Sequence, residues 1–505
     1  MTRVENSARG SRPMIDAEAD SNEAAAGLAV SGRERFFVLA IALAGLSVRL
    51  IALFWITPVD FRWESYHFWQ IAYYTLRIGF SQGRLWDLGG MEYFWGPLPI
   101  LTQSILLGLL NTSSILIMRI LNVILGAATA VAGYFVGKLY FNRVAGLLAG
   151  TLIAVNPVLI FNSTVGVSET VGVFFLILAL ATHRKRPLLT GVFLGMASLS
   201  RIELWLISIG IIFAYLVFEK QSSKFLYSLI GWIAVMMPYF IHVRGATGDP
   251  FYAFYWNFVG NIAGAWTPWH VDPAVRTAFG TILIASLVGL AILLWANWRK
   301  SRVRSYVLYA VLFGYLAYHG LVYTLGGLAP LFERFFVVDI AVASIIAGGL
   351  LSRSKPLTVL GICLVALVVT SGFVAAPYYV QLQQSIVDLY AVADRVGSEY
   401  DGGTILSDMP MMTYRFVEKW GISYRNILGT LYIPYEDPRA TLEWVESNKA
   451  TWLIVADPKG QRALSFFLDH ANVGYDKAVK LAFSFNGGSV YRIDQAAVEN
   501  LLAAG

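Results

Sequence analysis

The sequence predicts a mostly α-helical fold: a bundle of about eleven transmembrane helices followed by a small C-terminal α/β domain. The first observation is composition, since 57% of the 505 residues are hydrophobic and 14% are charged, against about 25% charged in soluble domains. The second is that mostly apolar runs recur from residue 36 to residue 374, and the runs of roughly 18 residues or more are long enough to cross a bilayer core. The third is a change of pattern after residue 375, where short apolar clusters alternate with polar helical stretches.

The N-terminal residues 1–32 are rich in Ala, Ser, Gly, Glu and Asp and offer little that could form a core. This composition predicts a disordered tail. The tail does not resemble a signal peptide, because no basic end leads directly into a short apolar stretch with a small-residue cleavage site. We therefore expect the first apolar run, 36–57, to stay in the protein as a membrane helix.

The basic residues predict the topology, since Lys and Arg favour the cytoplasmic side in short loops. The basic segments are 33–35, 138–143, 183–186, 220–224, 299–304 and 353–355. If all of them lie inside, the N-terminal tail is cytoplasmic, the C-terminal domain is extracytoplasmic, and the protein is a multi-pass protein of the cell membrane. The eleven crossings are then 36–57, 115–137, 144–163, 170–182, 188–200, 203–218, 226–243, 276–297, 306–327, 335–351 and 357–374.

The apolar segment 97–110 does not fit this alternation as a crossing. It is short and begins with prolines, so we expect a helix along the outer interface or packed on the bundle. A long outer loop, 58–114, follows from this placement. The predicted domains are thus the tail 1–32, a transmembrane domain 33–374 and an extracytoplasmic α/β domain 375–505.

The C-terminal domain is predicted from its alternation of short apolar clusters and polar helical patterns. GTILS at 403–407 and TWLIVA at 451–456 are typical of strands, and PRATLEWVESNK at 438–449 is typical of a surface helix. We expect three or more strands with helices.

Several function classes lose support at this point. The single cysteine, Cys363, excludes an intramolecular disulfide and a Cys-based metal site. The formal charge of +6 is spread between apolar runs, so it is a topology signal and no nucleic acid partner is expected. No GxxxxGK(S/T), GxGxxG or GxSxG motif is present, which removes support for a nucleotide-driven pump or a serine hydrolase.

The first candidate site lies in DFRWESYHFW, residues 60–69, directly after the first apolar run. If the stretch turns helical, Glu64 lies one turn from Asp60 and from His67. Two carboxylates and an imidazole on one surface could take a proton from a hydroxyl or hold a cation. The alternative is an interfacial helix anchored by its aromatic residues, with incidental charges.

A second group of charges is expected on the outer side. Glu169 lies at a membrane boundary, where a carboxylate is costly unless it is solvated, paired or functional; the alternative is a helix N-cap at Ser168 or Glu169. Arg201, with Glu203 close by, and Arg334 break the positive-inside pattern, and guanidinium groups suit phosphate binding. The alternative is ion pairing, of Arg201 with Glu169 or Glu203 and of Arg334 with Glu333.

The loop 251–270 is dense in aromatic residues, among them Trp266, and ends at His270. Such rings stack on sugar faces or anchor a protein at the lipid interface. His242 and His270 show no paired ligand spacing.

These motifs, in this order, resemble the GT-C superfamily of membrane glycosyltransferases, which includes protein O-mannosyltransferases, aminoarabinose transferases and the catalytic subunits of oligosaccharyltransferases. The resemblance covers about 40–374. It rests on ESYHFW at 64–69, WGPLPILTQSILLGLL at 95–110, VSET at 167–170, GMASLSRIE at 195–203 and PLFERFF at 330–336.

The resemblance implies transfer of a sugar from a polyprenyl-phosphate donor to a hydroxyl of a protein, lipid or glycan acceptor on the outer face, with inversion. It implies that Glu64 or Asp60 is the base, that His67, Trp266 and His270 contact substrate, and that Arg201 and Arg334 stabilise the departing phosphate. It maps the second acidic motif to Glu169. No cofactor is required by the sequence, and a divalent metal held by carboxylates and a histidine stays open. A transporter or lipid-carrier flippase, or a noncatalytic scaffold, is the competing hypothesis.

Overall fold

The computed structural model describes residues 32–80, 95–255, 336–352 and 355–504, together with positions 307, 308, 311 and 314. The predicted site residues Trp266, His270 and Arg334 lie outside the described residues, as do most of the tail 1–32, the predicted span 276–297 and most of the span 306–327.

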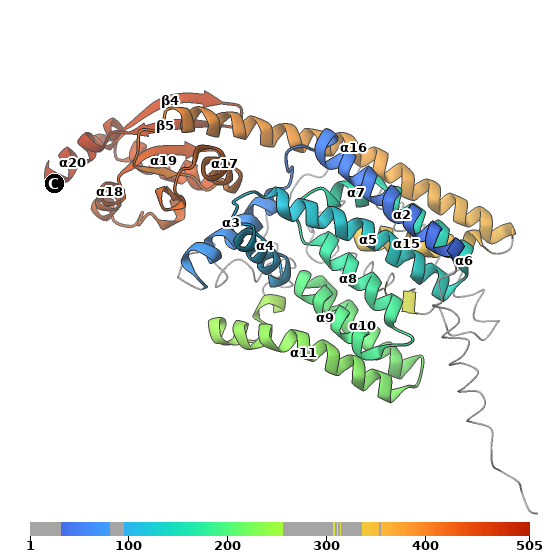
Figure 1. Cartoon of the computed structure of the whole chain (residues 1–505). Helices are drawn as coiled ribbons and strands as arrows, with labels where there is room; N and C mark the ends of the chain where they lie inside the picture. Colours follow the sequence, from blue (N-terminus) through green and yellow to red (C-terminus); the bar gives the residue numbers. More distant parts are fainter. Residues whose placement is uncertain are drawn as a thin grey trace, which may run out of the picture.

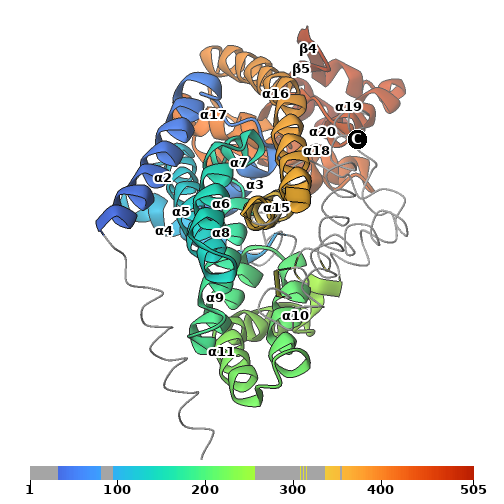
Figure 2. The ribbon, with the colours of Figure 1, turned by 90° about the vertical axis from the view of Figure 1, so that its right-hand side faces the viewer.

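The first half of the chain is a helical bundle (Figure 1). Its first helix, α2 (Gly32–Ile51), continues through a π-helical turn at Ala52–Ile56, and α3 (Trp63–Ile78) and α4 (Pro97–Leu109) follow outside it. The next helices are α5 (Leu116–Tyr140), α6 (Arg143–Val155), α7 (Pro157–Ser163), α8 (Glu169–Thr182), α9 (Pro187–Ser200), α10 (Glu203–Val217) and α11 (Ser222–Thr247). Near the end of the bundle α15 (Val337–Leu351) packs against α6 and α16, as the turned view shows (Figure 2).

Three described helices are long and apolar enough to cross a membrane: Gly32–Ile56, Leu116–Tyr140 and Ser222–Thr247. A fourth candidate is the pair α6 and α7, which covers the predicted crossing 144–163 but is bent by 56°, so this segment is a broken helix. The apolar helices α8, α9, α10 and α15 have 14 or 15 residues, fewer than the roughly 20 that a perpendicular crossing needs. Helix α4, at 13 residues, is short, as predicted for the segment 97–110.

The bend between α6 and α7 has a local cause. Pro157 has no N–H, so the carbonyl of Ile153 loses its helical donor, and the bend also frees the carbonyl of Ala154. Arg49 of α2 supplies both missing donors, at 3.1 Å to Ile153 and 2.8 Å to Ala154. Asn156 accepts from the backbone N–H of Leu159 at 3.1 Å and starts α7.

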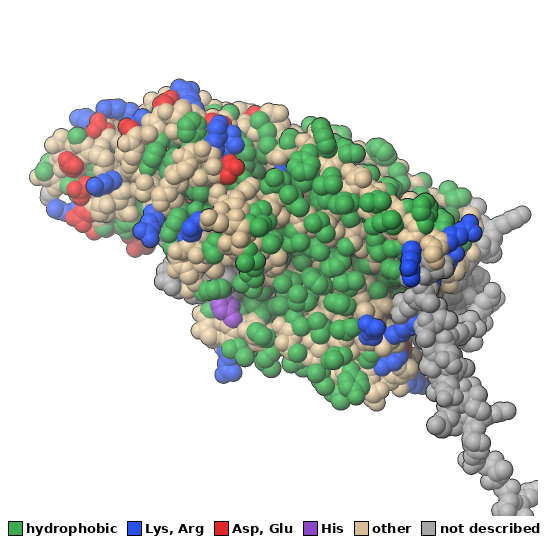
Figure 3. Space-filling model, viewed as in Figure 1, with side chains coloured by type: hydrophobic (Ala, Val, Ile, Leu, Met, Phe, Trp, Pro, Cys, Tyr) green, Lys and Arg blue, Asp and Glu red, His purple; other side chains and the backbone are tan. Residues whose placement is uncertain are grey.

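The surface of the bundle is a broad hydrophobic belt (Figure 3). Large apolar side chains are exposed on it, with Leu109 at 77%, Trp55 at 74% and Ile241 at 65% of their full accessibility. Soluble monomers rarely expose apolar patches of this extent, and the belt is the surface that lipid would cover.

The basic segments described by the structure meet at one end of the bundle. Lys138 binds Glu34 at 2.5 Å, Arg184 donates to the carbonyl of Leu139 at 3.3 Å, and Lys224 donates to the carbonyl of Arg184 at 3.0 Å. In Figure 3 the Lys and Arg side chains of this end lie opposite the C-terminal domain.

Helix α16 (Lys355–Ser398) carries the chain from the bundle into the C-terminal domain without a break. The sequence predicts that the membrane helix stops at 374 and that a separate domain starts at 375. The helix instead continues for 24 residues, because the segment after 374 remains compatible with a helix although it is no longer apolar. At about 1.5 Å per residue, its 44 residues span roughly 66 Å.

The C-terminal domain contains a mixed five-stranded sheet in the order β2-β1-β3-β5-β4. The strands β1 (Thr404–Leu406), β2 (Ile427–Leu428) and β3 (Ala450–Val455) are parallel, and β5 (Gly488–Ile493) and β4 (Val479–Phe485) form an antiparallel hairpin. The helices are α17 (Pro410–Trp420), α18 (Pro438–Ser447), α19 (Pro458–Asp469) and α20 (Gln495–Ala504). The predicted strands at 403–407 and 451–456 and the helix at 438–449 are confirmed as β1, β3 and α18.

The central strand β3 is buried on both faces, and its side chains alternate between two cores. On one face Leu453 and Val455 of β3 join a core with helices α18 and α19. On the other face Trp452 and Ile454 join a core that also includes Trp69 of α3. The C-terminal domain therefore shares a core with α3, and it lies directly on this helix (Figure 1).

Candidate functional site

The loop between α2 and α3 is held by Asp60 at the end of the bundle that lies next to the C-terminal domain. One carboxylate oxygen accepts the backbone N–H of Arg62 at 3.0 Å, and the other accepts the backbone N–H of Gly166 at 2.8 Å. Arg119 lies 3.9 Å from the same carboxylate. Asp60 thus ties the loop before α3 to the loop between α7 and α8, which is 106 residues away in sequence.

Two polar side chains of α5 complete this connection. Arg119 donates to the carbonyl of Thr164 at 2.6 Å, to that of Pro58 at 2.9 Å and to that of Thr57. Asn122, one turn along, donates to the carbonyls of Val165 at 2.6 Å and Val167 at 2.9 Å. Arg119 and Asn122 are not among the site residues predicted from the sequence, although both interrupt an apolar span in which polar residues are costly.

Asp60 is 2% exposed, so its carboxylate has almost no free surface. Burial raises its pKa, while Arg119 and the two backbone N–H groups favour the ionised form. The sequence analysis places Asp60 within one helical turn of Glu64. Helix α3 instead begins at Trp63, and the Asp60 carboxylate is turned toward Gly166.

Glu64 lies in the first turn of α3 and is partly exposed. His67 follows it by three residues, so both lie on one face of the helix, and the charge of Glu64 acts on His67. The imidazole stacks on Trp95 with ring centroids 5.7 Å apart. Burial lowers the pKa of His67 to about 4 against the opposing effect of Glu64, so the imidazole is neutral at pH 7.

The second candidate group is an ion-pair cluster. Arg201 follows α9 directly and donates to Glu169 at 2.7 Å and to Ser168 at 3.3 Å. It also makes a two-pronged contact with Glu203, at 2.6 Å and 3.2 Å. Both ion pairs that the sequence analysis offers as the alternative for Arg201 are therefore formed, and the guanidinium has few hydrogen-bond donors left for another anion.

The two groups lie next to each other through the turn at Trp95–Gly96. Gly96 has a φ of +91°, and a Cβ there would lie 2.5 Å from the carbonyl oxygen of Leu199, so only glycine fits. Trp95 contacts His67 on one side of this turn, and Ser200 and Arg201 end α9 on the other. The turn at Trp95–Gly96 thus connects the α3 group to the end of α9, which Arg201 follows.

The C-terminal domain packs on another face of α3, the one that carries Tyr66 and Trp69. The hydroxyl of Tyr66 donates to the backbone carbonyl of Asp60 at 2.8 Å and lies 2.8 Å from the hydroxyl of Tyr390 on α16. Tyr414 of α17 packs on Trp69 with ring centroids 5.0 Å apart. The sequence analysis did not anticipate these contacts, because aromatic residues in α3 are also typical of lipid anchoring.

A metal site is not preformed among the described residues: no group of three or more His, Cys, Asp or Glu side chains lies close enough to bind an ion. The reason is visible in the contacts above. The carboxylates of Asp60 and Glu169 face different partners, a backbone N–H in one case and Arg201 in the other.

The described residues thus form a helical bundle with two acidic loops and an arginine at the end of a helix, and a small α/β domain packs beside them. Residues 96–243 match the family model described as dolichyl-phosphate-mannose-protein mannosyltransferase. No curated protein matches the sequence closely enough to count as a relative.

Solved structures of GT-C enzymes share this fold. ArnT from Cupriavidus metallidurans bound to undecaprenyl phosphate aligns with a TM-score of 0.59 and 11% identity over 90% of this chain and 97% of that chain. The apo oligosaccharyltransferase of Archaeoglobus fulgidus aligns with a TM-score of 0.53 and 12% identity over 92% and 75% of the two chains. The same archaeal enzyme, AglB, in complex with an inhibitory peptide and a dolichol-phosphate aligns with a TM-score of 0.51 and 11% identity, again over 92% and 75%.

The chain is therefore a mostly helical membrane protein with the GT-C fold, and the predicted resemblance to GT-C glycosyltransferases is confirmed.

Proposed function

We propose that this protein transfers one sugar from a polyprenyl-phosphate donor to an acceptor hydroxyl on the outer face of the membrane. The observation that carries the proposal is the pairing of Glu64 and a neutral His67 on one face of α3, where His67 stacks on Trp95 next to the turn that meets the end of α9. Two of the structurally similar proteins are bound to an undecaprenyl phosphate and to a dolichol-phosphate, which supports a lipid-phosphate carrier.

Glu64 is the base in this proposal. The acceptor oxygen attacks the anomeric carbon, its proton passes to the Glu64 carboxylate, and the bond between the anomeric carbon and the phosphate oxygen breaks, so that the lipid phosphate leaves. Glu64 is chosen over Asp60 because it is partly exposed, whereas Asp60 is enclosed and bound to Gly166. Asp60 is then a positioning residue that fixes the start of α3.

The departing phosphate needs a positive partner that is not already neutralised. Arg201 is bound by Glu169 and Glu203, so we assign it to holding the outer loop in place. The phosphate role falls to Arg334, on the sequence resemblance alone. His67, being neutral, can accept or donate a hydrogen bond to a sugar hydroxyl without adding charge.

The outer-face orientation is supported by the basic end of the bundle. The contacts of Lys138, Arg184 and Lys224 gather the positive segments opposite the C-terminal domain. By the positive-inside rule, that end faces the cytoplasm and the catalytic end faces outward.

The test is transfer of a labelled sugar from a panel of polyprenyl-phosphate donors by membranes that carry the wild type, Glu64→Gln or Asp60→Asn. The matched control is Glu443→Gln, a surface glutamate paired only with Arg439 one turn away. We expect Glu64→Gln to lose transfer by a factor of roughly 10²–10⁴ while binding the donor normally. Full activity of Glu64→Gln would overturn its assignment as base. Donor movement across the bilayer without transfer would favour the flippase hypothesis.

A further inference from the structure

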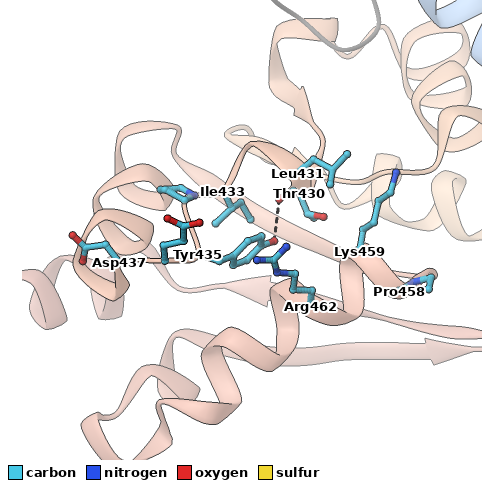
Figure 4. A pocket seen from close by; sticks show the side chains of 10 residues that line it. Thr430, Leu431, Ile433, Tyr435, Asp437, Pro458, Lys459 and Arg462 are labelled. Atoms are coloured by element: carbon cyan, nitrogen blue, oxygen red, sulfur yellow. Dashed lines mark hydrogen bonds between the residues drawn. The ribbon is translucent and has the colours of Figure 1, made fainter. Parts of the chain in front are cut away.

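A pocket of about 470 Å³ lies at the edge of the C-terminal domain (Figure 4). It is lined by residues from the turn after β2 and by the first turn of α19. Its volume falls within the roughly 300–1,000 Å³ of small-molecule sites. No residue predicted from the sequence to act in transfer belongs to it.

The topology of the sheet explains why a pocket forms there. The chain passes from β1 to β2 on one side and then crosses to β3 on the other side of β1. Strand order therefore reverses at β1, and in open α/β sheets ligands bind outside the carboxyl ends of the strands at such a point. Thr430 follows β2 and Pro458 follows β3, so the pocket lies at these carboxyl ends.

The wall formed by α19 is positive. Lys459 and Arg462 are three residues apart on α19 and so share a face. The guanidinium of Arg462 lies 4.5 Å from the ring centre of Tyr435. In the part of the chain that the structure describes, neither cation forms an ion pair with a carboxylate. Figure 4 shows both side chains projecting from the helix beside Thr430 and Tyr435.

The opposite wall offers oxygen atoms. Glu436 and Asp437 line it, and Asp437 also caps α18 by accepting the backbone N–H of Arg439 at 2.9 Å. The hydroxyl of Tyr435 donates to the carbonyl of Thr430 at 2.9 Å. Thr430 is in turn fixed by Asp408, which accepts its backbone N–H at 3.1 Å. The ring and the turn are therefore held rigidly, as binding sites require.

The pocket belongs to the C-terminal domain, whose helix α17 packs on α3. A molecule held by Lys459 would thus be bound on the domain that contacts the helix of Glu64 and His67.

We propose that this pocket binds an acidic sugar residue of the acceptor, one that carries a carboxylate or a phosphate. The anionic group would contact Lys459 and Arg462 by charge-assisted hydrogen bonds. The ring hydroxyls would donate to Glu436 and Asp437, and the ring would pack beside Tyr435. The evidence for a binding site is the geometry of the pocket. Its role as an acceptor site rests on the proposed transfer reaction.

The test is saturation-transfer difference NMR on the full-length protein in phosphatidylcholine nanodiscs, with glucose, glucuronate and glucose 6-phosphate as probes. We expect glucuronate and glucose 6-phosphate to bind at least about tenfold more tightly than glucose, and Lys459→Ala and Arg462→Ala each to remove most of this preference. The matched control is Lys480→Ala, which removes a lysine paired with Asp494 elsewhere on the domain. Equal binding of the three sugars, or a preference that survives both pocket substitutions, would overturn the proposal.

A second readout separates this proposal from the proposed function. In the transfer assay Lys459→Ala and Arg462→Ala should raise the acceptor concentration needed for half-maximal rate, and leave donor binding unchanged. If the wild type binds acidic sugars but transfers no sugar, the pocket is a binding site for acidic sugars and its acceptor role is rejected. Transfer that is equally efficient in both variants with an acidic acceptor would reject the acceptor role while the transfer reaction stands.

Discussion

Arg201 is shared between two carboxylates, with one terminal nitrogen 2.7 Å from Glu169 and the other 2.6 Å from Glu203. Glu169 is 4% exposed and begins α8, whereas Glu203 begins α10. The guanidinium therefore joins the ends of three helices, since Arg201 itself ends α9. It neutralises one of two negative charges that would otherwise face each other at the edge of the bundle.

Removal of this guanidinium should destabilise the protein. Arg201→Met leaves Glu169 buried without its positive partner, and loss of one member of a buried ion pair costs roughly 3–5 kcal/mol. Arg201→Lys should be more stable than Arg201→Met but less stable than the wild type, because an ammonium group does not reproduce the two-pronged contact with Glu203. The measurement is thermal unfolding in detergent. An unchanged melting temperature for Arg201→Met would contradict the structural role.

His67 should make stability depend on pH. Its pKa is lowered to about 4 in the folded protein, against an ordinary value of about 6.5, so between these values the unfolded chain binds the extra proton. The free energy of unfolding is then highest above about pH 6.5, and it falls as the pH is lowered toward 4. The comparison is His67→Gln, whose unfolding midpoint should vary less over this interval. An identical pH profile for the variant would show that the imidazole does not titrate in this way.

Arg49 and Pro157 should be coupled. Arg49→Leu deprives the carbonyls of Ile153 and Ala154 of their donors, which should cost roughly 1–3 kcal/mol for each buried carbonyl. Pro157→Ala restores a backbone N–H that can reach Ile153, so the cost of Arg49→Leu should be smaller in the Pro157→Ala background. A double-mutant cycle of unfolding in mixed micelles measures this difference. If the changes in unfolding free energy of Arg49→Leu and Pro157→Ala are strictly additive, the two residues do not compete to supply a donor to Ile153.

Tyr414 should hold the C-terminal domain on α3. Its ring is 6% exposed and packs against Trp69, so Tyr414→Ala should cost roughly 3–5 kcal/mol, the range for loss of a buried ring. Limited proteolysis of the segment after α16 would report the loosened contact as faster cleavage. Tyr227→Ala, which removes a ring on the exposed face of the bundle, is the control and should cleave at the wild-type rate.

Local pattern was sufficient to predict the strands β1 and β3, the helix α18 and the short helix at 97–110. Their signals are contained in a few adjacent residues, such as the proline that opens α18 and the apolar run of β3. The same kind of signal failed at residue 375, because hydropathy falls there while the backbone continues as one helix. The fall in hydropathy indicates where the chain leaves the apolar environment, and it does not indicate where the helix ends.

The candidate site shows the limit of spacing arguments. Spacing puts Asp60 and Glu64 on one helical face, but the direction of the Asp60 carboxylate is set by Gly166, a partner 106 residues away. The pairing of Arg201 with both Glu169 and Glu203 was one of the alternatives that the sequence left open, and only the packing of α8 against α9 decides it. The roles of Tyr390 and Tyr414 also depend on a domain that folds back onto α3.

The unbroken course of α16 has a mechanical consequence. Its first half packs on α15 in the bundle and its second half carries the contacts of Tyr390 and of Asp394, which binds Arg415 of α17 through two hydrogen bonds of 2.9 Å. The C-terminal domain can therefore tilt relative to the bundle only if this helix tilts or bends. Pro377 lacks the N–H that would bond to the carbonyl four residues earlier, so we expect any bend of α16 to occur there.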